Sequence, residues 1–93
     1  MSTRAVTVPI TGVLLAPYNP RRTALAMWNN GTETCFWSND PLSTSTQGFP
    51  VPTSLPISFA KEFGDDPTLS VYAISQTVNN NFRVYEAFGE GGV

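Results

Sequence analysis

Residues 26–37 read AMWNNGTETCFW and place both tryptophans of the chain on either side of an Asn-Asn-Gly sequence. Asn30-Gly31 is the strongest short signal for a two-residue β-hairpin, because both residues tolerate the positive φ that a type I′ turn requires. The flanking runs, 22–28 and 32–38, are rich in aromatic and other apolar residues. The stretch therefore predicts an antiparallel hairpin with Trp28 on one strand and Trp37 on the other.

The predicted hairpin carries large apolar side chains on both faces. With a two-residue loop, Leu25 would face Phe36 on one side, while Ala24 would face Trp37 on the other. A sheet in a sandwich needs only one apolar face, so the second face requires another cover. Three covers are compatible with the residues: another part of the chain, such as the 42–54 loop or the N-terminal run; an identical subunit or larger assembly; or a sugar ring stacked on an indole.

The rest of the sequence predicts strands rather than helices. Eight prolines and seven glycines separate short runs rich in Val, Ile, Thr and aromatic residues, which is typical of antiparallel strands joined by turns. The chain, at 93 residues, has the length of one domain. We therefore expect a single all-β domain over 1–93, an antiparallel β-sandwich, jelly-roll-like or Ig-like, of about six or seven strands. The expected strands are 5–10, 13–16, 22–28, 32–38, 55–60, 69–75 and 82–88, with at most a short strand near 48–51.

The two ends of the chain differ from this central part. Val6, Val8 and Ile10 alternate with smaller or polar residues, and Pro9 removes one backbone donor, which suits an edge strand or an exchanged arm. Residues 1–16 are therefore a candidate for an extended N-terminal arm. The glycine-rich residues 89–93 are expected to be a frayed tail.

Composition and charge exclude several classes of function. Hydrophobic residues make up 41% and charged residues 13%, with a net charge of −2, so the chain is too apolar to be disordered. Only Arg21 and Arg22 are adjacent among the five basic residues, which is too little clustering for a nucleic-acid groove. These two arginines are either solvated or clamp a carboxylate on a neighbouring chain.

No apolar run approaches the roughly 18 residues of a membrane span, and no secretory signal is recognisable, so we expect a soluble protein made in a cytoplasm.

Residues suited to catalysis or metal binding are scarce. The sequence has no histidine and one cysteine, so neither a Ser-His nor a Cys-His pair can form. Cys35, in mid-strand beside aromatic residues, is expected to be inert packing. Glu62, Asp65 and Asp66 lie close together, but their spacing matches no calcium loop, and a turn before Pro67 explains the two aspartates more simply. We predict no enzyme activity, no cofactor and no metal site.

Five segments together resemble a known group of proteins. They are NPRRTALAMWNNG at 19–31, GFP at 48–50, LPISF at 55–59, VYAIS at 71–75 and FRVYE at 82–86. In this order they resemble small β-sandwich proteins of tailed-phage particles, in which an arginine opens a strand that ends in Asn and Gly, a Gly-Pro loop follows, and Tyr-Ala and Arg-Val-x-Glu strands close the domain. The paired tryptophans and the short chain, with no separate receptor-binding domain, depart from that pattern.

The resemblance implies a non-enzymatic virion structural protein. Members of the group decorate or cement capsids, or build spikes and fibre bases, as symmetric oligomers whose N-terminal arm reaches onto the shell or a neighbour. We therefore expect a capsid decoration or cement protein that stabilises the bacteriophage head as a homo-oligomer, with a trimer favoured, located in the virion after synthesis in the host cytoplasm. Its partners would be itself and a major capsid protein or another virion protein, with no nucleic acid and no membrane. The residues expected at the subunit or capsid interface are Trp28, Trp37, Arg21, Arg22, Val6, Val8 and Ile10.

The alternative is a carbohydrate-binding module, or a receptor-binding spike or fibre component, that uses exposed aromatic residues. Trp28, Trp37, Tyr72 and Tyr85 are its candidate stacking residues. Because a sugar ring packs on the face of an indole or a phenol, this interpretation requires those rings to be exposed.

Overall fold

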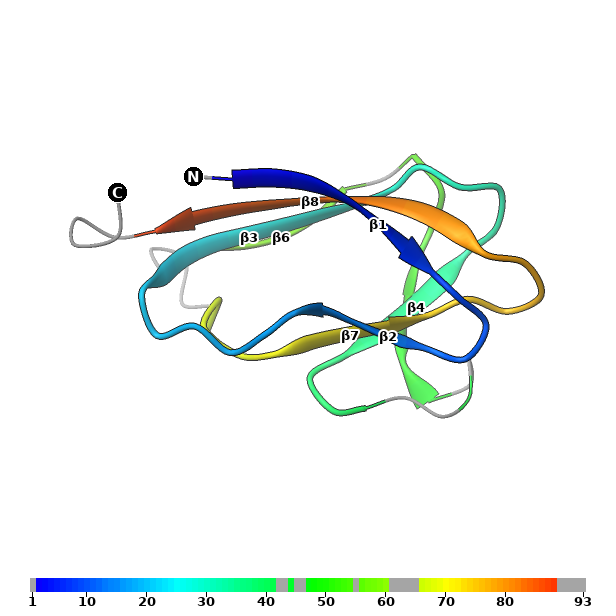
Figure 1. Ribbon diagram of the computed structural model, residues 1–93, viewed down its shortest axis with the longest axis horizontal. Helices are drawn as coiled ribbons and strands as arrows, with labels where there is room; N and C mark the ends of the chain where they lie inside the picture. Colours follow the sequence, from blue (N-terminus) through cyan, green and yellow to red (C-terminus); the bar gives the residue numbers. More distant parts are fainter. Residues whose placement is uncertain (1, 42–43, 45–46, 55, 61–65, 89–93) are drawn as a thin grey trace.

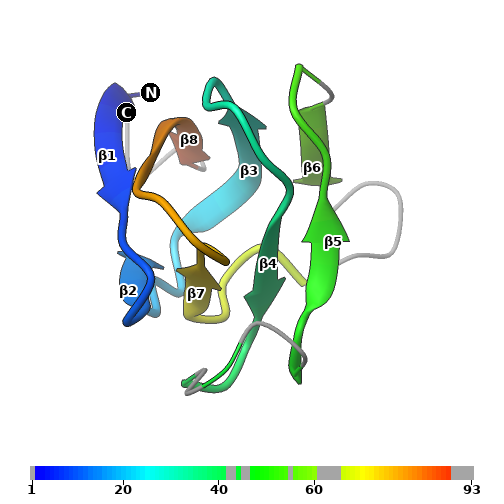
Figure 2. The same ribbon diagram turned by 90° about the vertical axis from the view of Figure 1, so that its right-hand side faces the viewer.

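The computed structural model describes residues 2–41, 44, 47–54, 56–60 and 66–88. Its strands are β1 (Ser2–Val8), β2 (Val13–Ala16), β3 (Arg22–Asn29), β4 (Cys35–Ser38), β5 (Phe49–Val51), β6 (Pro56–Ala60), β7 (Val71–Ile74) and β8 (Asn80–Phe88). Sheet A has the strand order β1-β8-β3-β6, and sheet B has the order β2-β7-β4-β5. The two sheets form two layers that lie face to face (Figures 1 and 2).

The expected all-β antiparallel sandwich is confirmed, with eight strands rather than six or seven. Each strand of the first half pairs with one of the second half: β1 with β8, β2 with β7, β3 with β6, and β4 with β5. The chain is therefore folded like one long hairpin that has been rolled up, so that successive pairs alternate between the sheets. This winding is that of a jelly roll, one of the two sandwich types expected from the sequence.

The hairpin predicted at Asn30-Gly31 is wrong, because β3 lies in sheet A and β4 lies in sheet B. Side-chain oxygens accept hydrogen bonds from the backbone N–H groups that would begin the ladder of a hairpin. The Gly31 N–H donates to Asn29 Oδ1 at 2.9 Å, and the Thr32 N–H donates to Asn80 Oδ1 at 2.7 Å. Gly31 does not have a positive φ. Its missing side chain instead makes room for Asn80, whose Oδ1 would lie 1.8 Å from an added Cβ.

The segment predicted as an N-terminal arm forms two strands of the sandwich. β1 pairs with β8 in register from Ser2, opposite Glu86, to Val8, opposite Asn80. Val8 on β1 and Leu15 on β2 belong to the hydrophobic core. β1 and β2 are therefore part of the sandwich and do not form an arm that extends away from the domain. The predicted frayed tail, 89–93, lies outside the described residues.

The core lies between the two sheets, because alternate residues of each strand point inward. Leu25 and Met27 of β3 and Val84 of β8 pack in one cluster with Val71 and Ala73 of β7. None of these five side chains is more than 2% exposed, and burial of a valine, leucine or methionine side chain contributes about 1.5–3 kcal/mol. The residues between them on β3 and β8 point to the outside of sheet A.

Candidate functional site

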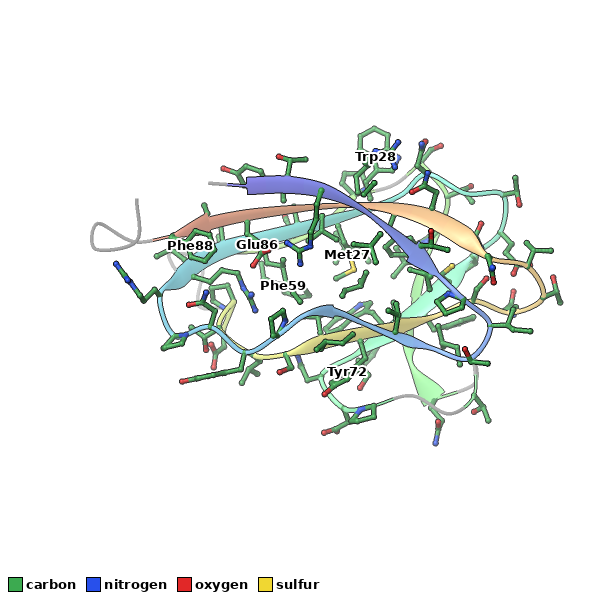
Figure 3. The ribbon with its side chains drawn as sticks, viewed as in Figure 1. Met27, Trp28, Phe59, Tyr72, Glu86 and Phe88 are labelled. Atoms are coloured by element: carbon green, nitrogen blue, oxygen red, sulfur yellow. The ribbon has the colours of Figure 1, made fainter. Side chains whose placement is uncertain are left out.

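The two tryptophans lie on different sheets and have different surroundings. Trp28 belongs to β3 and is 46% exposed, and Figure 3 shows it pointing away from sheet B. Trp37 belongs to β4 and packs against the core, with its ring centroid 4.9 Å from that of Phe59 in an edge-to-face arrangement. The chain itself therefore covers part of Trp37, and Trp28 is the indole left on an open surface.

Trp28 borders a shallow hollow of about 170 Å³ on the outer side of sheet A. In the register of the sheet, Trp28 lies opposite Arg83 of β8 and Pro56 of β6, and Ala26 lies opposite Tyr85 of β8. The small Ala26 side chain leaves the surface low between the indole and the phenol. The hollow is lined by Thr3, Ala26, Met27, Trp28, Pro56, Arg83, Val84 and Tyr85. Met27 and Val84 are buried in the core, and we call the other six residues the Trp28 face.

The Trp28 face is almost uncharged. Its one ionised side chain is Arg83, which donates from Nη1 to Asn81 Oδ1 on the same strand at 2.8 Å. Exposed apolar surface of this kind is typical of contact sites. Burial of the exposed part of the indole, roughly 100 Å², would contribute about 2–3 kcal/mol to a complex.

Buried residues on both sides fix the direction of Trp28. Met27 and Asn29 are both buried, so the indole cannot turn inward without displacing them. Asn29 donates from Nδ2 to the carbonyl oxygens of Glu33 at 2.7 Å and Val51 at 3.0 Å. These bonds hold the end of β3 in place, so its backbone directs Trp28 to the outer side of sheet A.

A carboxylate holds the turn between β7 and β8. Glu33 accepts hydrogen bonds at 2.7–3.1 Å from the backbone N–H groups of Gln76, Thr77 and Val78. It also accepts hydrogen bonds from the hydroxyl groups of Ser75 and Thr77. These bonds, the one from the Thr77 amide above all, lower the pKa of Glu33 from 4.5 to about 2. Because the donors belong to its own chain, the carboxylate acts as a structural anchor.

The single cysteine lies beside this cluster. Cys35 is fully buried, and Asn80 donates from Nδ2 to its sulfur at 3.3 Å and to Ser75 Oγ at 2.8 Å. Burial raises the pKa of the Cys35 thiol. A raised pKa disfavours the thiolate that nucleophilic chemistry requires.

Arg22 ties the two sheets together at the opposite end of β3. Its buried guanidinium donates, at 2.6–3.0 Å, to the Glu86 carboxylate and to the carbonyl oxygens of Pro17, Pro67 and Leu69. Arg4 pairs with the same carboxylate. Burial alone would raise the pKa of Glu86, but hydrogen bonds from Arg4 and then from Arg22 outweigh it, and the pKa lies below its ordinary value. The partner of Arg22 is thus a carboxylate of its own chain.

The other predicted interface residues are scattered over the molecule. Val8 and Arg22 are buried, and Val6 packs partly buried against the core. Arg21 and Ile10 are exposed, but neither lines the Trp28 face. The structure therefore gives three of these five residues a place in the interior of the fold, and their roles at an interface stay predictions.

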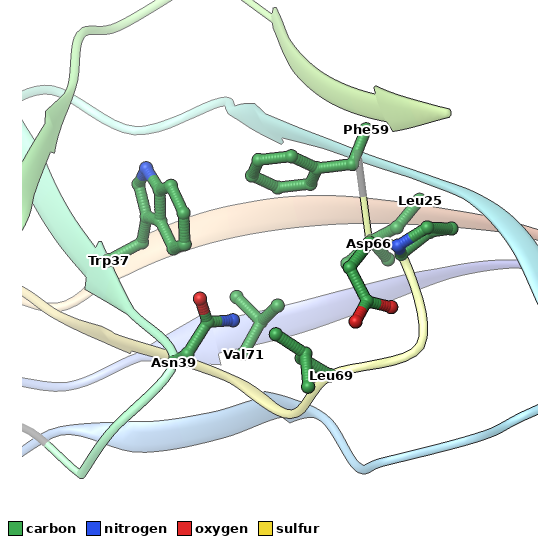
Figure 4. A pocket seen from close by; sticks show the side chains of 8 residues that line it. Leu25, Trp37, Asn39, Phe59, Asp66, Leu69 and Val71 are labelled. Atoms are coloured by element: carbon green, nitrogen blue, oxygen red, sulfur yellow. The ribbon is translucent and has the colours of Figure 1, made fainter. Parts of the chain in front are cut away.

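A second cavity, of about 240 Å³, opens between the sheets beside Trp37 (Figure 4). Its lining is Leu25, Trp37, Asn39, Phe59, Asp66, Pro67, Leu69 and Val71. Asp66 accepts the hydroxyl and the N–H of Thr68, and these bonds lower the pKa of Asp66. This carboxylate therefore belongs to the turn before β7, while Glu62 and Asp65, considered with it as metal ligands, lie outside the described residues.

The remaining signs of function are few. Within 2–41, 44, 47–54, 56–60 and 66–88, no group of three or more His, Cys, Asp or Glu side chains could hold a metal ion. No helix able to cross a membrane occurs in that part of the chain. Comparisons with protein-family models, with curated proteins and with solved structures found no match to this chain. Function is therefore inferred from the geometry of the Trp28 face.

Sequence reasoning named Trp28 and, among the candidate stacking residues, Tyr85, but it did not place Tyr85 and Arg83 beside Trp28. Tyr85 and Arg83 reach Trp28 only through the pairing of β8 with β3, which no local pattern specifies. A usable signal lies within β8 itself, where Phe82 and Val84 are buried and the alternate residues Arg83 and Tyr85 point outward. That alternation predicts which side chains of 82–86 share a face, although it does not say which strand lies beside them.

Proposed function

We propose that this chain is a non-enzymatic assembly component, a virion structural protein that decorates or cements a capsid as a homo-oligomer. The observation that supports this best is the half-exposed Trp28 on an almost uncharged sheet face. The five segments that resemble tailed-phage proteins suggest the kind of assembly. A jelly roll is compatible with this role, since the fold occurs in capsid proteins, but it also occurs in lectins and cupins.

The outer side of sheet A, which carries the Trp28 face, has a size that suits a contact repeated many times. Four strands about 4.8 Å apart and roughly 20 Å long cover about 400 Å² on one partner. One such contact buries about 800 Å² in total, which is less than the roughly 1,200–2,000 Å² of a stable complex. Contacts made together on a symmetric shell raise each other's effective concentration. A protein that binds a particle at many equivalent positions can therefore use a face this small.

The test is binding of the purified chain to purified capsids of the virus whose genome encodes it, measured by co-sedimentation. We expect saturable binding with a fixed number of copies per shell. Trp28→Ala should weaken it at least about tenfold, because the contact loses more than the 1.4 kcal/mol that a factor of ten represents. Tyr72→Ala is the matched control, since Tyr72 lies on the outer side of sheet B (Figure 3). No binding, or equal binding by Trp28→Ala, would contradict the proposal.

A carbohydrate-binding function is the second candidate, and one observation favours it. Trp28 and Tyr85 place aromatic rings on the same face. Of the other two candidate stacking residues, Trp37 packs against Phe59 and Tyr72 projects from the other sheet. Titration of the Trp37→Phe variant with a panel of glycans separates the two functions, because a sugar stacked on Trp28 would quench the remaining indole fluorescence in a saturable way.

A further inference from the structure

The jelly roll has four edge strands, and three of them are short and carry a proline or a shift of register. An edge strand offers backbone donors and acceptors to any neighbour, so proteins shorten, bulge or interrupt such strands. β5 has three residues with Pro50 in the middle, and β6 begins with Pro56, which has no N–H. β2 has four residues and a shift of register between Leu14 and Ala16.

β1 is the exception. It has seven residues and no proline, and its register with β8 is unbroken from Ser2 to Val8. Its one charged side chain, Arg4, pairs with Glu86 and donates to the Leu15 carbonyl oxygen at 2.6 Å. Arg4 therefore points toward the other sheet, and its charge does not prevent another strand from pairing with the edge. The outward-pointing residues are small or β-branched and uncharged: Thr3, Ala5 and Thr7. Within the described residues, β8 is the one strand that pairs with β1.

We propose that the outer edge of β1 pairs antiparallel with the β1 edge of a second copy of this chain, about a two-fold axis at Ala5. The two A sheets then form one continuous sheet. This register places Thr3 opposite Thr7 and Arg4 opposite Val6, with Ala5 opposite its own copy. All of β1 is paired, and no like charges face one another. A register centred on Arg4 would instead place two cations opposite each other, which is unfavourable.

The second copy is favoured as the occupant because β1 is complementary to itself in this register. A chain of 93 residues also buries only roughly 60–65% of its unfolded surface, so an added strand on one sheet is a useful gain. The joined sheet carries two Trp28 faces on the same side, which doubles the contacts available to a partner. A two-fold pair differs from the trimer that the phage resemblance implies. Edge pairing leaves the Trp28 face uncovered, so this proposal and the proposed function can fail independently.

The test places charges at Ala5, which is exposed and would lie on the two-fold axis. An edge contact is small and therefore weak, so sedimentation equilibrium must extend to roughly 1 mM protein. Ala5→Lys and Ala5→Glu should each weaken dimer formation by a factor of roughly two to five, because like charges would face each other across the pair. An equimolar mixture of the two variants should recover the dimer as a heterodimer.

The matched control is Ser58→Lys, an exposed position on the same side of sheet A but on the opposite edge strand, β6. It should dimerise like the wild type, and circular dichroism verifies that each variant is folded. A wild type that stays monomeric at about 1 mM, Ala5 variants that dimerise as tightly as the wild type, or a mixture that does not recover the dimer would each overturn the proposal. So would a monomer whose β1 edge captures an extended segment of another protein instead.

Discussion

At the scale of single residues, a few polar side chains hold together segments that the strand ladders leave unpaired. A jelly roll crosses between its sheets repeatedly, and each crossing leaves backbone groups that need partners. Asn29, Glu33 and Asn80 supply them at one end of β3, and Arg22 supplies them at the other. No buried side-chain nitrogen or oxygen lacks a hydrogen-bond partner in the described part of the chain. These residues therefore hold the crossings between the sheets at both ends of β3.

Glu33 should make the fold sensitive to acid. Because its pKa is lowered from 4.5 to about 2 in the folded chain, the stabilisation it provides is complete above about pH 4.5 and is lost as the pH falls toward 2. We expect the free energy of unfolding to decrease over this window more steeply for the wild type than for Glu33→Gln. Urea unfolding at a series of pH values measures both slopes. Glu86 and Asp66, whose pKa values are also lowered, should still make the stability of Glu33→Gln depend on pH. Equal slopes for the wild type and the variant would contradict the prediction.

At the scale of elements, the strands could be predicted but their pairing could not. The runs between prolines and glycines specify extended structure locally, and the second expected strand, 13–16, matches β2. The Asn30-Gly31 signal failed because a residue far along the chain competes with the hairpin ladder. Asn80, which lies 48 positions further on, accepts the hydrogen bond of the Thr32 N–H. The same limit applies to the site, since Trp28 is recognisable alone while Tyr85 joins it only through the register of β8.

Gly31 offers a test of this explanation. A Cβ at Gly31 would lie 1.8 Å from Asn80 Oδ1, so Gly31→Ala must displace a side chain that accepts the Thr32 N–H and donates to Ser75 Oγ. We expect a loss of about 2–4 kcal/mol in the free energy of unfolding, from two disrupted hydrogen bonds of partly buried groups. Gly31→Asn should be as damaging, although a type I′ hairpin turn would accept it. Urea unfolding measures both variants, and a loss below about 1 kcal/mol in either would mean that Asn80 does not fill this space.

At the scale of the whole molecule, the N-terminal segment belongs to both layers. β1 forms one edge of sheet A and β2 forms one edge of sheet B. Together they bring Val8, Leu15 and Ala16 into the core, and Arg4 of β1 reaches across to the Leu15 carbonyl oxygen. The same segment carries the unprotected edge, so one stretch of chain serves the stability of the monomer and the proposed pairing with a second copy.

Removal of residues 2–16 should therefore abolish folding and not merely detach an arm. Val8 and Leu15 each contribute about 1.5–3 kcal/mol by burial, and their loss, with that of two ladders, is comparable to the roughly 5–15 kcal/mol that stabilises a small domain. Circular dichroism and urea unfolding of the truncated chain should show no cooperative transition. A synthetic peptide of residues 2–16 added to it should restore the transition, whereas the same peptide with Val8→Asp should not, because it would bury an unpaired charge. If the truncated chain alone unfolded cooperatively at the wild-type midpoint, residues 2–16 would be a separable arm, and the jelly roll would not need its first two strands.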